Sequence, residues 1–184
     1  MPYTGIDHFI ARLRFRAAYP HIRAGSRVLD LGCGLEAAFL EYANDRIASG
    51  VGLDDQVEEG VGGRWQRVRA DLRAPLPFPD GDFDHVVMLA VLEHLTEPEK
   101  VLREAHRVIA AEGSLILTWP SSMVDPILRV LHGLRLVSDE MESDEHQKRI
   151  PVDTLQETLR NIGFQKFIHR TFEFGLNNLM VARR

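Results

Sequence analysis

The chain has 184 residues, the size of a single domain that can bury a substantial hydrophobic core. Its formal net charge of −5 argues against a general nucleic-acid binder, which would carry a basic surface. No apolar run approaches the roughly 20 residues that a membrane-spanning helix needs, and one cysteine cannot form an internal disulfide, so we expect a reducing, cytoplasmic location.

The first half of the chain alternates helical and strand patterns. A helix is predicted over residues 6–18, because apolar side chains recur there with helical period. The elements predicted next are a strand at 27–31, a helix at 36–47, and strands at 51–54 and 66–70. Only about ten residues separate the last two strands, near the minimum for a parallel crossover, so the helix between them is expected to be short or absent.

The second half continues the alternation and closes with two neighbouring strands. Thr96-Glu97-Pro98-Glu99 matches a capping box with a helix-starting proline and opens a helix to about residue 109. Asp153 and Gln156 are predicted to cap another helix, which Gly163 ends. The remaining predicted elements are strands at 83–89, 114–118, 164–172 and 178–182. This order of elements predicts a three-layer α/β sandwich.

Residues 121–150 do not fit this alternation. Residues 123–134 place apolar side chains at helical spacing, which is typical of packing on the body of the same protein. A lid over a hydrophobic ligand or a dimer contact are the alternatives. Residues 139–145 are strongly acidic, and we expect a solvated loop there rather than a metal site.

Residues 28–36 combine a short apolar strand with a glycine turn. Gly32 and Gly34 allow the backbone to turn tightly and approach a ligand, and Asp54 follows about 20 residues later, as in a nucleoside-binding βαβ unit. The permissive dinucleotide pattern is also satisfied. Asp30, however, precedes the first glycine, and a carboxylate there would repel a pyrophosphate but suit a cationic ligand.

Four short motifs follow one another in a characteristic order. They are LDLGCG at 29–34, ADL at 70–72, LPFPDGDFD at 76–84 and EHL at 93–95. In this order the chain resembles the class I S-adenosylmethionine-dependent methyltransferases, in particular their small-molecule branch related to quinone biosynthesis. The resemblance is good over roughly residues 25–120. It implies one Rossmann-like domain over 1–184 with a seven-stranded, mostly parallel sheet, an antiparallel last strand, and a lid or substrate insertion at 121–150.

The resemblance also implies a set of cofactor-binding residues. Gly32 and Gly34 would let the backbone pass the methionine part, which Asp30 would help to orient. Asp54 would accept hydrogen bonds from both ribose hydroxyls, since its two oxygens can bind a diol. Asp71 would accept from the adenine amino group, and the Leu72 amide would meet a ring nitrogen. No metal is implied.

The implied reaction is methyl transfer to an oxygen, nitrogen or carbon atom of a small molecule. A base is needed only if the acceptor arrives protonated, and His94 and His146 are the candidates. Both histidines also have purely structural interpretations. Glu36 stands where relatives commonly have a third glycine; it either stabilises a helix start, crowds the methionine end or binds its ammonium group.

Two other functions remain open at this point. One is a nicotinamide-dependent oxidoreductase, and the other is a non-catalytic module that retains the cofactor fold. Neither a nucleic-acid partner nor a membrane span is expected, and the oligomeric state is open.

Overall fold

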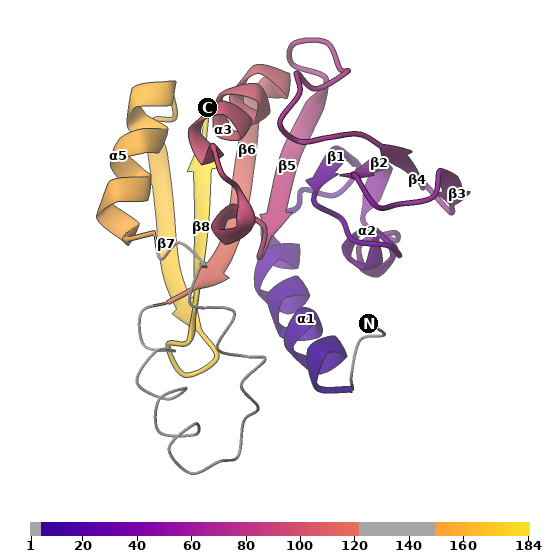
Figure 1. Cartoon of the computed structure of the whole chain (residues 1–184), viewed down its shortest axis with the longest axis horizontal. Helices are drawn as coiled ribbons and strands as arrows, with labels where there is room; N and C mark the ends of the chain where they lie inside the picture. Colours follow the sequence, from indigo (N-terminus) through magenta and orange to yellow (C-terminus); the bar gives the residue numbers. More distant parts are fainter. Residues whose placement is uncertain (1–4, 122–149) are drawn as a thin grey trace.

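The computed structural model describes residues 5–121 and 150–184, with side chains from residue 9 onward. Its elements are the helices α1 (Gly5–Ala18), α2 (Ala38–Tyr42), α3 (Pro98–Val108) and α5 (Val152–Ile162), the 3-10 turns η1 (Tyr19–His21) and η2 (Leu92–His94), and the strands β1 (Ser26–Leu31), β2 (Ile47–Asp54), β3 (Gly60–Gly62), β4 (Trp65–Arg69), β5 (Phe83–Leu89), β6 (Ile109–Pro120), β7 (Lys166–Phe172) and β8 (Asn177–Arg183). The strands form one mixed sheet in the order β3-β4-β2-β1-β5-β6-β8-β7 (Figure 1).

The strand order reverses at β1, in the middle of the sheet. β1 pairs in parallel with β2 on one side and with β5 on the other. Ligands of open α/β sheets bind beyond the carboxyl ends of the strands at such a reversal. Gly32 follows β1, Asp54 ends β2 and Ala90 follows β5, so these residues share that edge.

Two hydrophobic cores cover the two faces of the sheet. Because successive side chains of a strand point to opposite faces, Val28 and Ile116 pack against α1 and α2, whereas Leu29 and Leu117 pack on the other side. That second side is covered by α3 and α5, which lie beside each other (Figure 1). The predicted three-layer α/β sandwich is therefore confirmed.

The connection between β2 and β4 contains no helix, as predicted, but it contains a strand that was not predicted. β3 pairs antiparallel with β4, so the sheet has eight strands rather than seven. A Cβ on Gly62 would lie 2.4 Å from the Trp65 ring, and Gly63 has a φ of +56°. These two glycines make the tight turn of the β3–β4 hairpin possible.

The helix predicted at 36–47 is much shorter in the structure. Ala37 adopts a left-handed conformation (φ 47°), so the helix α2 begins only at Ala38. It ends at Tyr42, because the chain turns and enters β2 at Ile47. Glu36 therefore lies two residues before the helix rather than at its first position.

The predicted side-chain cap of α5 is not present, and Thr96 is not the N-cap residue of α3. α3 starts at Pro98 with Glu97 as its N-cap, and α5 starts after Pro151; neither cap residue makes a side-chain hydrogen bond to the helix. Proline disfavours helical geometry in the residue before it, which places the boundary at Glu97 rather than at Thr96. The predicted C-cap is confirmed, since Gly163 ends α5 with a φ of 128°.

The closing strands were predicted correctly in place and direction. β8 pairs antiparallel with β6 and with β7, and Gly175 lies in the turn between β7 and β8. Within residues 5–121 and 150–184, no helix has both the length and the apolar character needed to cross a bilayer.

Candidate functional site

The glycine turn after β1 forms the floor of the site. The Gly32 amide donates a hydrogen bond to the Leu53 carbonyl (2.8 Å), which fixes the turn against the end of β2. Gly32 has a φ of +73°, and a Cβ there would lie 2.5 Å from a methyl carbon of Val91. Gly34 also has a positive φ (67°). Glycine is therefore required here for both conformation and space.

Asp54 connects this turn to the end of β2. Its Oδ2 accepts a hydrogen bond from the Gly34 amide at 3.0 Å, and its Oδ1 accepts one from the Gln56 amide at 3.0 Å. Each carboxylate oxygen has a second lone pair, so both can accept a further hydrogen bond from a ligand. The carboxylate is thus held in place and is half-buried at the cavity wall.

A cavity of about 650 Å³ opens beyond the strand ends, a size typical of small-molecule sites. Its wall brings together most of the residues that the sequence indicated. These are Gly32, Gly34, Asp54, Asp71, Leu72 and His94. They come from four separate connections that meet at one edge of the sheet.

Asp71 is exposed and already paired with a cation. The Arg73 Nε and backbone amide both donate to it at 2.8–2.9 Å, and Arg73 Nη2 lies 2.8 Å from Oδ2. The hydrogen bonds from Arg73 hold the pKa of Asp71 below its usual value. A ligand that uses Asp71 must therefore share this carboxylate with Arg73.

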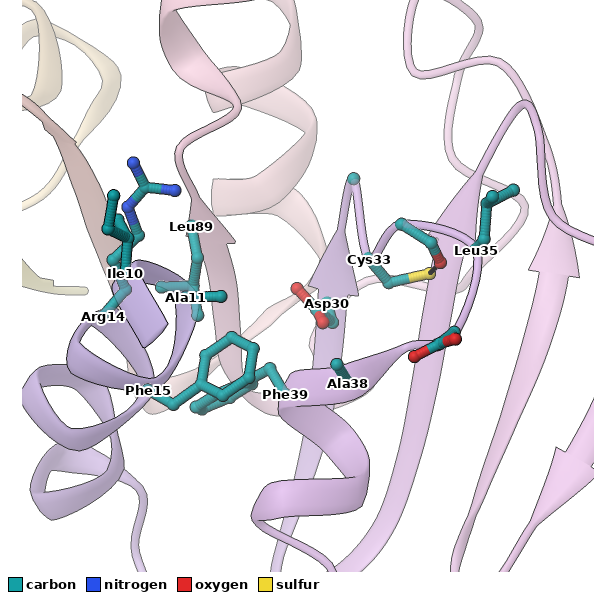
Figure 2. Close-up of a pocket in the computed structure, with 13 residues that line it drawn as sticks. Ile10, Ala11, Arg14, Phe15, Asp30, Cys33, Leu35, Ala38, Phe39 and Leu89 are labelled. Atoms are coloured by element: carbon teal, nitrogen blue, oxygen red, sulfur yellow. Dashed lines mark hydrogen bonds between the residues drawn. The ribbon is translucent and has the colours of Figure 1, made fainter. Parts of the chain in front are cut away.

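A smaller cavity of about 260 Å³ adjoins the first through Gly32, Gly34 and Leu35. Figure 2 shows the residues of α1 on one side of it, the glycine turn on the other, and Asp30 between them. Glu36 and Arg14 also line it. The cavity therefore has two carboxylates and one guanidinium, a set that suits a zwitterion.

Asp30 is a strongly perturbed group of the site. Only 3% of the residue is exposed. Burial first, and the nearby charge of Asp54 second, raise the pKa of Asp30 to about 7. Because both effects disfavour the anion, a positive charge in the cavity would be strongly favourable.

The two candidate bases have different outcomes. His94, at the end of η2, is exposed and lines the larger cavity. His146 lies outside the described residues, as does the acidic segment 139–145. No group of three or more potential metal ligands occurs in the part of the chain that the structure describes.

Arg14 is a site residue that the sequence pattern did not reveal. It follows Ile10 by four residues, so both lie on the face of α1 that borders the smaller cavity. Its Nε is buried and has no hydrogen-bond partner among the described residues. The sequence does place this charged residue in line with an apolar helix face. Which cavity the residue reaches depends on where the helix packs, however, and the sequence pattern does not show that.

Comparison with known proteins agrees with this geometry. A family model described as a methyltransferase domain matches residues 4–167. The chain is 34% identical over 106 residues to the 27-O-demethylrifamycin SV methyltransferase of Amycolatopsis mediterranei, covering 52% of this chain and 39% of the relative. It is 27% identical over 192 residues to the ubiquinone/menaquinone biosynthesis C-methyltransferase UbiE of Ectopseudomonas mendocina, covering 89% and 74%.

The fold is also that of solved structures. A SAM-dependent methyltransferase from Archaeoglobus fulgidus superposes with a TM-score of 0.74 at 17% identity, covering 96% of this chain and 94% of that one. At this identity the likeness concerns the fold. The chain spans less than half of the rifamycin-related enzyme and about three quarters of UbiE.

Proposed function

This chain belongs to the S-adenosylmethionine-dependent methyltransferase family, and we propose that it transfers a methyl group from that cofactor to a small molecule. The acceptor atom is an oxygen, a nitrogen or a carbon. The observation that carries the proposal is the pairing of two nearby aspartates, Asp30 and Asp54, at neighbouring strand ends around the glycine turn. This arrangement suits a cationic nucleoside and repels a pyrophosphate.

The residues of the two cavities fit the cofactor in parts. Asp54 offers free lone pairs to the ribose hydroxyls, and Asp71 and the Leu72 amide lie on the same wall for the adenine. Asp30 and Glu36 face the smaller cavity, where they favour an ammonium group. Arg14, with its buried and unpaired Nε, is the matching group for a carboxylate.

For this reaction the protein mainly has to position the two reactants. When bound, the cofactor would supply a methyl group on a positively charged sulfur, from which a neutral thioether is a good leaving group. The glycine turn and Asp54 fix one reactant, which removes much of the entropic barrier. His94 lies at the cavity wall and takes the proton of an acceptor that arrives protonated.

The small-molecule acceptor is supported by the relatives. One is named for 27-O-demethylrifamycin SV and another for a C-methylation in ubiquinone and menaquinone biosynthesis. We propose a substrate of that size for this chain, one domain over residues 1–184, and a cytoplasmic location consistent with the single cysteine. That residues 121–150 cover the acceptor, with His146 as a second base, stays a prediction.

Two titrations and one assay test the proposal. Calorimetry with S-adenosylhomocysteine is expected to show binding, and reduced nicotinamide cofactor is expected to show no fluorescence change on addition of protein. Label from methyl-tritiated S-adenosylmethionine is expected in the small-molecule fraction of a deproteinised cell extract. Binding of the nicotinamide cofactor would instead support the oxidoreductase, for which the relatives named above give no support. Binding without any transfer would support the non-catalytic module.

A further inference from the structure

Unpaired buried polar atoms gather at one corner of the ligand edge. Within residues 5–121 and 150–184, Thr118 Oγ1, Glu173 Oε1 and Asn177 Oδ1 are buried and have no hydrogen-bond partner. Thr118 is fully buried, and Asn177 is 6% exposed. Most buried polar side-chain atoms of folded proteins are paired, since an unpaired one is destabilising. We call these three residues the polar corner.

The polar corner lies on the α1 face of the sheet. Ile116 of β6 and Leu179 of β8 pack in the core beneath α1, and side chains two residues apart on a strand share a face. Thr118 and Asn177 therefore point to the same side. Thr118 pairs with Leu179, and Asn177 pairs with Pro120 and with Phe172 of β7, at the ends of these strands.

The polar corner is next to the smaller cavity. Thr118 is the strand partner of Leu89, which lines that cavity, and the Thr118 carbonyl accepts a hydrogen bond from the Ala90 amide (2.9 Å). On the other side, Arg14 lines the cavity, and its charge acts on the Glu173 carboxyl. The three residues do not themselves line the cavity that we assign to the methionine end of the cofactor; the corner lies behind its Leu89 wall.

The hairpin that carries Glu173 is strained. Glu173 and Phe174 both have positive φ angles (52° and 57°), and the Gly175 amide donates to the Phe172 carbonyl (3.1 Å). Four residues connect the paired Phe172 and Asn177, and the first two, a glutamate and a phenylalanine, adopt the left-handed conformation that favours asparagine or glycine. Unfavourable backbone geometry of this kind concentrates at functional sites.

The hydrogen bonds within the corner define what it can bind. Asn177 Nδ2 donates to Glu173 Oε2, which orients the amide so that Oδ1 faces away from the carboxylate. The two atoms left without partners on these side chains, Glu173 Oε1 and Asn177 Oδ1, are both acceptors. A ligand that satisfies them must donate hydrogen bonds.

We propose that Thr118, Glu173 and Asn177 bind the methyl acceptor, and that this acceptor is a small molecule whose hydroxyl or amino groups donate hydrogen bonds to Glu173 and Asn177. The inference rests on the proposed function and names the substrate class of the same site. It adds a specificity subsite at the β6–β8 corner to the cofactor cavities. The fully exposed Phe174 at the turn is available to cover an apolar part of that molecule.

Two variants test the subsite by transfer of tritiated methyl label to the small-molecule fraction of an extract. Thr118→Val replaces the unpaired hydroxyl with a methyl group of the same shape, and Glu173→Gln removes the charge at constant size. Each is expected to lower transfer at least tenfold at low extract concentration, with partial recovery at high concentration. Affinity for S-adenosylhomocysteine should stay within twofold of wild type.

Thermal unfolding supplies a readout that needs no acceptor. Thr118→Val is expected to raise the Tm by roughly 2 to 4 °C, because it removes an unpaired buried polar group. The control is Ser114→Ala, on the same strand and face, whose hydroxyl lies 2.8 Å from His85 Nδ1. That control is expected to lower the Tm and to leave methyl transfer unchanged.

The outcomes separate this inference from the proposed function. Wild-type transfer that neither variant reduces would overturn the subsite and leave the methyltransferase assignment standing. A Tm that falls in Thr118→Val as it does in Ser114→Ala would show that the hydroxyl has a structural partner, and would overturn it too. Each labelled product is expected to carry a hydroxyl or amino group, either free or methylated. Products that carry neither would contradict the proposed substrate class. No transfer by wild type contradicts the proposed function itself.

Discussion

A single carboxylate, that of Asp54, both fixes the glycine turn and offers a binding surface. Its two oxygens accept hydrogen bonds from the backbone amides of Gly34 and Gln56, and each oxygen retains one free lone pair. The turn is therefore held before any ligand arrives. Such preorganisation lowers the entropy that is lost when a ligand binds.

We predict that Asp54→Asn weakens binding of S-adenosylhomocysteine by roughly 10- to 100-fold, because a charged, two-point acceptor for the ribose becomes a neutral, one-point acceptor. The asparagine oxygen still accepts the Gly34 amide, whereas the exposed Gln56 amide loses its acceptor, so only a modest fall in the thermal midpoint is expected. Isothermal titration calorimetry measures the affinity. The control is Asp153→Asn on the exposed start of α5, which should bind like wild type. Equal affinities for the two variants would refute this role of Asp54.

The residues that were predicted and those that were missed differ in what determines their place. Asp54 ends one predicted strand and Asp71 follows another, and parallel strands bring their carboxyl ends to one edge, so chain order alone brought the two residues together. Arg14 reaches the site only through the packing of α1 on the sheet, and the proposed subsite residue Asn177 depends in the same way on the packing of the last hairpin. That packing depends on contacts between distant segments, which a local pattern does not contain.

Among the elements, the β7–β8 turn combines poor turn residues with a well-formed hairpin. Phe174 is fully exposed, makes no core contact and has a φ of 57°. A left-handed conformation destabilises an ordinary residue by about 1 to 2 kcal/mol relative to glycine. The hairpin tolerates this residue because β8 pairs with both β6 and β7, and these pairings hold the turn closed.

We predict that Phe174→Gly raises the free energy of unfolding by up to about 1 kcal/mol, the relief of strain less the added entropy of the unfolded chain. Urea denaturation followed by circular dichroism measures the change. Val61→Gly is the matched control: Val61 is also apolar and exposed, but it lies in β3 without a positive φ, so that substitution should destabilise the protein. A loss of stability in Phe174→Gly would mean that the side chain packs in solution.

The accuracy of the predicted elements follows from how each is encoded. β5 was predicted to the residue, because Pro79-Asp80-Gly81 marks its start and a continuous apolar run follows, although no turn residue marks its end at Leu89. α2 was predicted too long, since nothing in the alanine-rich sequence marks Ala37 as left-handed. β3 was missed because three residues with two glycines have no strand propensity of their own; pairing with β4 makes them a strand.

At the scale of the whole molecule, two buried groups at opposite ends of the sheet respond to pH in opposite directions. Burial raises the pKa of Asp30 to about 7, at the ligand edge. At the amino end of β5, burial and the Arg23 charge lower the pKa of His85 to about 4, where its Nε2 accepts the Arg23 amide (3.1 Å). Folding therefore takes up a proton at Asp30 and releases one at His85.

The direction of each effect follows from proton linkage. Asp30 binds its proton more tightly in the folded state, so its contribution to stability decreases as the pH rises from about 4 to 7. His85 binds its proton more tightly in the unfolded state, so its contribution increases as the pH rises from about 4 to 6.5. Each is on the order of 3 kcal/mol, and between pH 4 and 6.5 they largely cancel.

We predict that replacing either group reveals the pH dependence that the other group contributes to the free energy of unfolding. Relative to wild type, Asp30→Asn should become more stable with increasing pH between 4.5 and 6.5, and His85→Gln should become less stable over the same range. Urea denaturation at pH 4.5, 5.5 and 6.5 measures the free energy of unfolding of each protein. Because the other carboxylates are common to all three proteins, their titration cancels in the differences. Parallel pH profiles for the two variants would contradict the opposed protonation of Asp30 and His85. They would also contradict a folded state in which Asp30 holds a proton that a cationic ligand would displace.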